Sequence, residues 1–206
     1  MRDGINIHDV ENIGIELMGF IFYDKSPRFV SQMPSYLPEQ CPRVGVFVNS
    51  SMSSIMSKVI EYRLDYIQLH GDEDVDYCKE LKNRLPSEVK IIKSISVSNE
   101  YDVIQSKEYD QCADLLLFEN KCAGYGGSGM KFKWNHLSSY NGSIPFILSG
   151  GIGPDDVNSI LEISHSSFWG IDLNSRFELS PGIKDIDLLR TFINKIDNEQ
   201  NQSIIY

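Results

Sequence analysis

The sequence has no apolar run long enough to cross a bilayer, and its first residues, Met1 to Gly4, lack the apolar centre of a secretory signal. Cysteines are few: there are four, with no Cys-X-X-Cys pair and no histidine at zinc-binding spacing. We therefore expect reduced thiols, no metal site and a cytoplasmic protein without a membrane partner.

Positive charge is also scarce. The 206 residues hold 19 Lys and Arg against 29 Asp and Glu, which gives a net charge of −10, and no basic cluster is present. This balance argues against nucleic acid as a partner. An anionic small molecule would need a local positive site built from backbone amides and a few selected Arg or Lys side chains.

Short apolar stretches alternate with amphipathic segments along the whole chain, which is typical of a parallel sheet covered by helices. No linker divides the sequence, so we expect a single domain over residues 1–206. We count about seven strands where a (β/α)8 TIM barrel has eight, and the missing first strand should precede Asn6. The predicted strands lie within 17–22, 44–48, 65–69, 89–95, 113–118, 145–148 and 168–176, and the predicted helices within 6–17, 51–63, 72–85, 99–106, 134–139 and 185–196, with another beginning near Pro154.

The stretch from Pro145 to Pro154 is the most informative part of the chain. A short apolar strand runs into Ser149-Gly150-Gly151, and Pro154 with two following acids is typical of a helix start. Glycines let the backbone approach an anion, and unpaired amides can bind it. The next strand ends in Asn174-Ser175. In barrels of this class the loops after the last two strands bind phosphate, so a phosphate site is predicted here.

Four reactive side chains lie at or just after predicted strand ends: Arg28, His70, Glu119 and Asp172. Each alone has an ordinary explanation, as a solvated cation, a capping or packing histidine, an exposed carboxylate and an aspartate that binds loop amides. Barrel enzymes keep their catalytic groups at the carboxyl ends of the strands. Four such groups on one face, beside a phosphate site, therefore favour an active site.

The loop Gly124 to Gly129 is rich in glycine but lacks the Gly-Lys-Ser/Thr of a P-loop. We expect a mobile lid, because glycines lower the cost of a conformational change. A phosphate nest and a plain linker are the alternatives.

The chain resembles the phosphoribosylanthranilate isomerase family over nearly its whole length, and the motifs occur in order. That family is a single-domain (β/α)8 barrel of tryptophan biosynthesis. The residues that carry the resemblance are Gly19-Phe20-Ile21-Phe22-Tyr23 with Lys25-Ser26-Pro27-Arg28, Val44-Gly45-Val46-Phe47, Gln68-Leu69-His70-Gly71, Gly126-Gly127-Ser128-Gly129 with Phe132 and Trp134, Leu148-Ser149-Gly150-Gly151-Ile152, and Gly170-Ile171-Asp172-Leu173-Asn174-Ser175 with Glu178 and Pro181-Gly182-Ile183-Lys184-Asp185.

This resemblance implies an Amadori rearrangement of N-(5-phosphoribosyl)anthranilate to the 1-deoxyribulose 5-phosphate, the third step from chorismate. A general acid would open the furanose ring, and a general base would take the C2′ proton. No cofactor is implied, because the substrate nitrogen is the electron sink. The only implied partner is this phosphosugar-anthranilate substrate, bound by a monomer or homodimer.

The resemblance also implies roles for individual residues. Glu119 falls at the general-acid position, and Arg28 would face the anthranilate carboxylate. His70 and Asp172 would line the sugar site. The phosphate would be held by Gly150, Gly151, Asn174 and Ser175.

Three departures from the family pattern affect these expectations. The family begins with a strand ending in Cys-Gly, whose cysteine is the general base, and this chain begins at Met1-Arg2-Asp3. Glu119 replaces the general-acid Asp, and a displacement of about 1 Å can cost ~100-fold in rate. Lys133 and Arg176 replace the usual Asp and Gly.

Two alternatives follow from these departures. The first is a catalytically impaired barrel that binds phosphosugars. The second is another phosphate-handling barrel, such as indole-glycerol-phosphate synthase or a ribulose-phosphate epimerase. The synthase should carry catalytic lysines at strand ends, for which Lys93 is a lone candidate, and a metal-using epimerase should show clustered His and Asp ligands.

Overall fold

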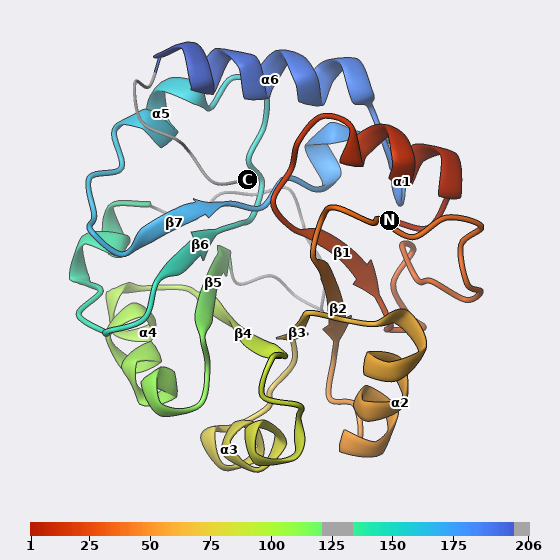
Figure 1. The fold of residues 1–206 in the computed structure, drawn as a ribbon. Helices are drawn as coiled ribbons and strands as arrows, with labels where there is room; N and C mark the ends of the chain where they lie inside the picture. The colour runs from red at the N-terminus through yellow and green to blue at the C-terminus, as the bar shows by residue number, and fades with distance from the viewer. Residues whose placement is uncertain (121–133, 200–206) are drawn as a thin grey trace.

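The structure is a computed structural model that describes residues 1–120 and 134–199. Seven parallel strands form one sheet in which spatial order follows chain order, so that each strand pairs with the next one (Figure 1). This curled sheet agrees with the predicted seven-stranded α/β architecture. Its strands are β1 (Met18–Ile21), β2 (Arg43–Phe47), β3 (Tyr66–Leu69), β4 (Lys90–Val97), β5 (Leu115–Asn120), β6 (Phe146–Leu148) and β7 (Phe168–Ile171).

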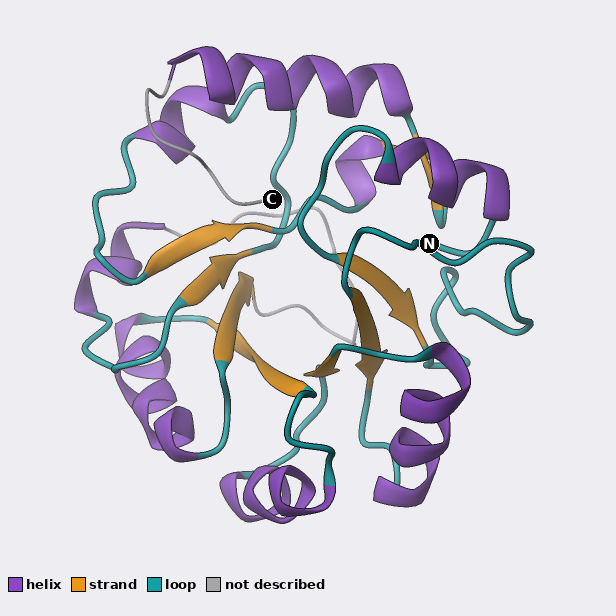
Figure 2. Ribbon diagram, in the orientation of Figure 1, coloured by secondary structure: helices purple, strands orange, loops and turns teal. Residues whose placement is uncertain are grey.

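The helices lie around the outside of the curled sheet, as Figure 2 shows. They are α1 (Gly4–Glu11), α2 (Met52–Tyr62), α3 (Val75–Arg84), α4 (Glu100–Gln105), α5 (Val157–Leu161) and α6 (Ile186–Glu199), with 3₁₀ helices η1 (Ser106–Gln111), η2 (Trp134–Ser139) and η3 (Ser175–Phe177). A search of the described part of the chain finds no helix with the length and apolar content to span a membrane.

Buried apolar side chains form two clusters. The larger one lies between the sheet and the helices and includes Ile67, Leu69 and Phe118. The smaller one lies inside the curl of the sheet, because alternate residues of a strand face opposite sides. Its buried members are Val44, Val46, Ile92, Leu115, Leu117 and Ile147.

The sheet ladder begins at β1 and ends at β7, and the described residues show no ladder between these two strands. Other segments meet the outer edge of β1. Val30 donates its amide to the Ile21 carbonyl at 2.9 Å, and the Met1 nitrogen donates to the Gly19 carbonyl at 2.7 Å. The carbonyls of Gly19 and Ile21 on this edge are therefore hydrogen-bonded, although no other described strand forms a ladder along it.

Two predicted helix starts were wrong. The helix predicted to begin at residue 72 begins at Val75, and the Asp74 side chain caps it by accepting from the Tyr77 amide. Helix α5 begins at Val157, three residues after Pro154. The carboxylate of Asp156 accepts the Gly153 amide at 2.7 Å, so this acid holds the end of the loop after β6.

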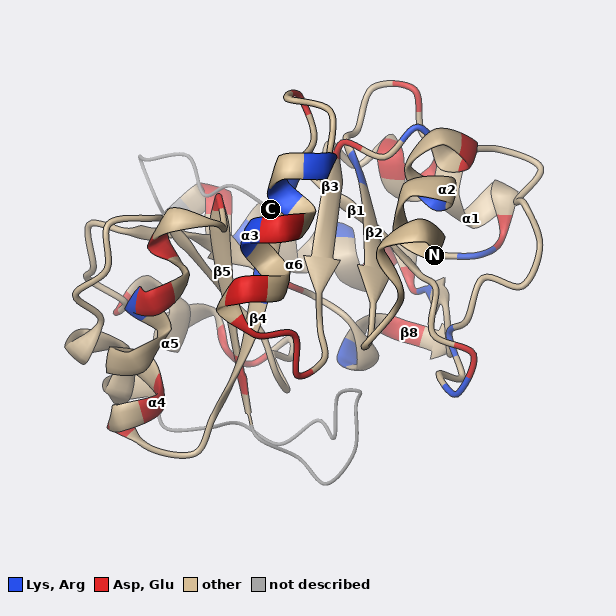
Figure 3. Cartoon of the chain, turned by 90° about the horizontal axis from the view of Figure 1, so that it is seen from below, with Lys and Arg blue, Asp and Glu red and all other residues tan. Residues whose placement is uncertain are grey.

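The chain after β7 forms a small antiparallel pair that the sequence pattern did not predict, β8 (Glu178–Ser180) and β9 (Ile183–Lys184). Gly182 lies in the turn with a φ of 85°, a conformation that glycine adopts without strain. Figure 3 shows most charged residues on the helices and loops around the sheet, and acidic colour on β8. This pair places Glu178 and Lys184 near the carboxyl end of β7.

Candidate active site

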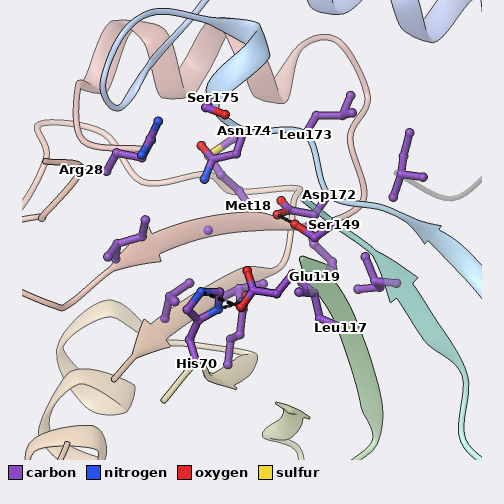
Figure 4. Close-up of a pocket in the computed structure, with 18 of the residues that line it drawn as sticks. Met18, Arg28, His70, Leu117, Glu119, Ser149, Asp172, Leu173, Asn174 and Ser175 are labelled. Atoms are coloured by element: carbon purple, nitrogen blue, oxygen red, sulfur yellow. Dashed lines mark hydrogen bonds and ion pairs between the residues drawn. The ribbon is translucent and has the colours of Figure 1, made fainter. Parts of the chain in front are cut away.

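All eight predicted site residues line one cavity of about 220 Å³, which reaches from the carboxyl ends of the strands into the curl of the sheet. The structure therefore brings together residues that are far apart in the sequence, as barrel topology predicts. Their individual roles remain predictions. The residues are Arg28, His70, Glu119, Gly150, Gly151, Asp172, Asn174 and Ser175, and Figure 4 shows six of them with labels.

The two glycines after β6 are required by the backbone. Gly150 and Gly151 have φ values of 90° and 74°, in the region that side chains disfavour. A Cβ on Gly150 would also lie 2.9 Å from the backbone nitrogen of Asn120. This turn therefore depends on glycine at both positions and brings backbone close to the cavity.

Glu119 and His70 are in direct contact within the cavity. Glu119 lies near the end of β5 and His70 directly follows β3, and the two side chains are each 15% exposed. The His70 Nε2 atom is 3.2 Å from Oε1 of Glu119 (Figure 4). On its other side, His70 Nδ1 lies 2.9 Å from both Gln68 Nε2 and Ser94 Oγ.

The surroundings of Glu119 suit a proton donor. Burial, together with the negative charge of Asp172, raises the pKa of Glu119 to about 7, although Lys93 acts in the opposite direction. Burial lowers the pKa of His70 and outweighs the attraction of Asp172. Near neutral pH the imidazole in this contact is therefore neutral, and Glu119 is poised to donate its proton.

Asp172, the residue after β7, is held by a neighbouring strand end. The hydroxyl of Ser149 donates to Asp172 Oδ2 at 2.7 Å, and the Asp172 amide donates to the Leu148 carbonyl. These bonds join the ends of β6 and β7, so the carboxylate of Asp172 has a defined position in the cavity.

Arg28 forms a bidentate pair with Glu178 of β8. Arg28 Nε lies 2.9 Å from both carboxylate oxygens, and Nη2 lies 2.6 Å from Oε2. The side chains are 13% and 5% exposed, so Arg28 is not a solvated loop cation. Such fork-like geometry fixes the orientation of a guanidinium.

Lys184 of β9 is a second cation that lines the cavity. Its Nζ atom donates to the Leu173 carbonyl at 2.9 Å and to Asn174 Oδ1 at 3.0 Å, and it lies 3.6 Å from Glu178. Burial lowers the pKa of Lys184, although Glu178 opposes this effect. Lys184 therefore supplies positive charge at the loop predicted to hold phosphate.

Burial alone would raise the pKa of Glu178, but hydrogen bonds from Arg28, the charge of Lys184 and the Gly182 amide outweigh it and lower the pKa. No role was predicted for Glu178 or Lys184 from the sequence. Both residues occur in the motifs that carry the family resemblance, and their place in those motifs was the only indication in the sequence that they belong to the site.

Lys93 does not line this cavity. Its Nζ atom lies 3.2 Å from Glu73 and donates to the Gly71 carbonyl at 2.7 Å, and both charged side chains are almost fully buried. Lys93 thus stabilises the turn after β3. It is not placed as a catalytic lysine in this cavity, which argues against the alternative of an indole-glycerol-phosphate synthase.

The described cysteines lie away from the cavity. Cys41, Cys78 and Cys112 are buried free thiols, and none of them lines it. In residues 1–120 and 134–199, no group of three His, Cys, Asp or Glu side chains is arranged to hold a metal ion. The predicted lid, Gly124 to Gly129, and Lys133 lie outside the described residues.

Comparison with known proteins identifies one family. The family model described as N-(5'phosphoribosyl)anthranilate (PRA) isomerase matches residues 4–195. The N-(5'-phosphoribosyl)anthranilate isomerase of Phocaeicola vulgatus is 45% identical over 196 residues, which cover 95% of this chain and 94% of the relative. That of Thermotoga neapolitana is 39% identical over 88% of each chain.

Solved structures agree with these sequence matches. The phosphoribosyl anthranilate isomerase of Thermotoga maritima superposes with a TM-score of 0.79 at 29% identity, covering 96% of this chain and 99% of that one. A second structure, in complex with reduced 1-(o-carboxyphenylamino)-1-deoxyribulose 5-phosphate, gives a TM-score of 0.73 at 27% identity and covers 96% and 99%. The predicted barrel fold is confirmed by these superpositions.

Proposed function

This chain belongs to the N-(5'-phosphoribosyl)anthranilate isomerase family, and we propose that it isomerises N-(5'-phosphoribosyl)anthranilate to 1-(o-carboxyphenylamino)-1-deoxyribulose 5-phosphate in tryptophan biosynthesis. The observation that carries this proposal is Glu119, a buried carboxyl whose pKa is raised to about 7 in the cavity. A carboxyl that keeps its proton near neutral pH is the group that an acid-catalysed ring opening requires.

In the first step the Glu119 carboxyl donates its proton to the ring oxygen of the ribose. The bond between C1′ and this oxygen breaks, the nitrogen lone pair forms the C1′=N bond, and a protonated Schiff base results. Removal of the C2′ proton then moves electrons to the nitrogen and gives an enolamine, which becomes the ketose. The substrate nitrogen accepts the electrons, so these steps need no cofactor.

The two anionic ends of the substrate match two groups of residues around the cavity. Arg28, oriented by Glu178, would pair with the anthranilate carboxylate. Backbone amides of Gly150, Gly151, Asn174 and Ser175 would bind the phosphate, with positive charge from Lys184 nearby. His70 and Asp172 also line the cavity and would contact the sugar.

The family resemblance assigns the removal of the C2′ proton to a cysteine at the end of the family's first strand. Among the described residues, none of the cysteines lines the cavity, and this observation supports the alternative of a phosphosugar-binding barrel with impaired catalysis. We favour the isomerase because the acid, the arginine and the phosphate loops line one cavity. We further propose that the protein acts in the cytoplasm as a monomer or homodimer.

The test is to incubate the purified chain with N-(5'-phosphoribosyl)anthranilate and to measure formation of the ketose product. Glu119→Gln, purified in the same way, is the control for contaminating activity. Product formation that depends on Glu119 supports the isomerase. Tight binding of the reduced product without turnover would instead identify a binding protein, and neither binding nor turnover would exclude both functions.

A further inference from the structure

The contacts of His70 contain information about where the acidic proton of Glu119 resides. Two side chains meet on the Nδ1 side of the imidazole: Gln68 Nε2 and Ser94 Oγ are each 2.9 Å from Nδ1 and are 3.0 Å from each other. On the Nε2 side, Oε1 of Glu119 lies 3.2 Å away. The ring is therefore held from both edges.

The amide nitrogen of Gln68 can only donate a hydrogen bond. Because it donates to Nδ1, that nitrogen must be an acceptor. Burial lowers the pKa of His70, so the ring is neutral near pH 7 and carries its single proton on the other nitrogen, Nε2. Nε2–H then faces Oε1 of Glu119, which lies 3.2 Å away.

A protonated carboxyl has one oxygen that accepts and one that carries the proton. His70 Nε2 lies next to Oε1, and in Figure 4 the other oxygen of Glu119 is turned away from His70. A proton on Nε2 therefore disfavours a second proton on Oε1. We propose that Gln68 is a positioning residue that, through the tautomer of His70, keeps the acidic proton of Glu119 on Oε2, where it can reach a bound substrate.

The opposite tautomer would have the opposite effect. With the proton on Nδ1, Nε2 would accept a hydrogen bond from the Glu119 carboxyl, and the acidic proton would point at His70 rather than at the substrate. This arrangement would also stabilise the protonated carboxyl. The other charged groups that face this pair are Asp172, Lys93 and Glu73, and they are the same in both tautomers.

The two chain positions next to Nδ1 provide a matched pair of variants. Gln68→Met removes the amide donor and keeps the side-chain length. Ser94→Ala removes the hydroxyl and leaves the Gln68 amide in contact with Nδ1. We expect only Gln68→Met to let the His70 proton move to Nδ1. The amide nitrogen of Gln68 can only donate a hydrogen bond, whereas the hydroxyl of Ser94 can donate or accept one.

The experiment is nitrogen-15 NMR of the histidine rings in the full chain at pH 7 to 8, with His70 assigned from the signals lost in His70→Asn. The chain has four histidines, so the assignment is tractable. We expect the Nε2–H form in the unmodified chain and in Ser94→Ala, and a mixture with the Nδ1–H form in Gln68→Met. An Nδ1–H form in the unmodified chain, or an unchanged tautomer in Gln68→Met, overturns the proposal.

The kinetic consequence rests on the proposed function. In Gln68→Met we expect kcat to fall about tenfold with KM nearly unchanged, since the proton is misdirected while the substrate contacts remain. The alkaline limb of the kcat profile should move up by about half a pH unit. A rise in KM alone would contradict the positioning role. If the unmodified chain does not turn over substrate, the proposed function fails, and the NMR result still decides the position of the proton.

Discussion

Glu119 lines the cavity, whereas Glu178 pairs with two cations that line it, Arg28 and Lys184, and the surroundings of these two glutamates shift their pKa values in opposite directions. Glu119 is 15% exposed and faces His70 and the charge of Asp172, so its pKa is raised to about 7. Glu178 is 5% exposed and faces Arg28 and Lys184, so its pKa is lowered. Burial favours the protonated form of both, and the neighbouring charges decide the outcome.

This difference separates two tasks. A carboxyl that holds its proton can donate it during catalysis, whereas a carboxylate that stays ionised can orient cations. The region of Glu119 is formed by the ends of β3 and β5, and the region of Glu178 by the loop after β1 and the β8–β9 pair. We therefore expect variants at Glu119 to change mainly kcat, and variants at Glu178 to change mainly stability and KM.

The largest effect is expected for Glu119→Gln. The amide keeps the shape and cannot donate an acidic proton, so kcat should fall by about 10²- to 10⁴-fold, the usual contribution of a general acid. Steady-state kinetics of product formation measures this change. Glu119→Asp is the matched control, because it keeps a carboxyl in a shorter side chain. Near-normal kcat in Glu119→Gln would show that another group supplies the proton.

The next effect is expected for Glu178→Gln, which leaves Arg28 and Lys184 without their shared carboxylate. Removing one partner of a buried ion pair typically lowers the free energy of unfolding by about 3–5 kcal/mol. We also expect KM to rise at least about tenfold, because Arg28 loses its orientation. Urea unfolding and steady-state kinetics measure the two quantities.

Asp187→Asn is the control for this variant. Asp187 pairs with Arg190 at 3.2 Å, but its side chain is 94% exposed, and pairs of this kind contribute little to stability. We expect no measurable change in unfolding or in KM. Equal losses in the two variants would show that the burial of the Arg28–Glu178 pair is energetically irrelevant.

The third effect is a pH dependence of stability with opposite signs for the two glutamates. Glu119 has a raised pKa, so its contribution is fully present below about pH 4.5 and is lost as the pH rises through about 7. The loss should amount to about 3 kcal/mol relative to Glu119→Gln. Glu178 has a lowered pKa, so its contribution is present above pH 4.5 and is lost as the pH falls through the folded-state pKa.

Urea unfolding at pH 4.5, 6 and 8 distinguishes the two glutamates. The stability difference between the unmodified chain and Glu119→Gln should shrink or reverse between pH 4.5 and 8. The difference from Glu178→Gln should stay constant over this range. Parallel behaviour of the two variants would contradict the opposite pKa shifts.

The sequence allowed the region of Glu119 to be predicted better than that of Glu178. Apolar runs predict the strands, and a reactive residue at the end of such a run, such as His70 or Glu119, faces the same rim as the others. Glu178 and Lys184 lie in strands of three and two residues that carry no apolar alternation. The Arg28–Glu178 pair joins positions 150 residues apart, and no local pattern contains it.

The first residues of helices α3 and α5 were also not predicted correctly from the sequence. A proline followed by two acids is typical of a first turn, yet Asp156 binds the Gly153 amide and extends the loop after β6. The Asp156 amide also donates to the Gly153 carbonyl at 3.0 Å, so Pro154 and Asp155 form a turn before the helix. The loop after β6 thus lines the cavity as predicted, but its conformation was not predicted, and its role in phosphate binding stays a prediction.

The smallest effect is expected for Ser149→Ala, which tests how far the environment of Glu119 depends on the fixed position of Asp172. The variant removes the 2.7 Å hydrogen bond to Asp172 Oδ2 and should lower the free energy of unfolding by about 1 kcal/mol. Freed from this bond, Asp172 can turn away, so the pKa of Glu119 should fall and the alkaline limb of kcat should move to lower pH. The matched control is Ser143→Ala, which removes a 2.9 Å bond to Asp110 at an exposed site outside the cavity. An unchanged pH profile in Ser149→Ala would show that burial alone, and not the charge of Asp172, raises the pKa of Glu119.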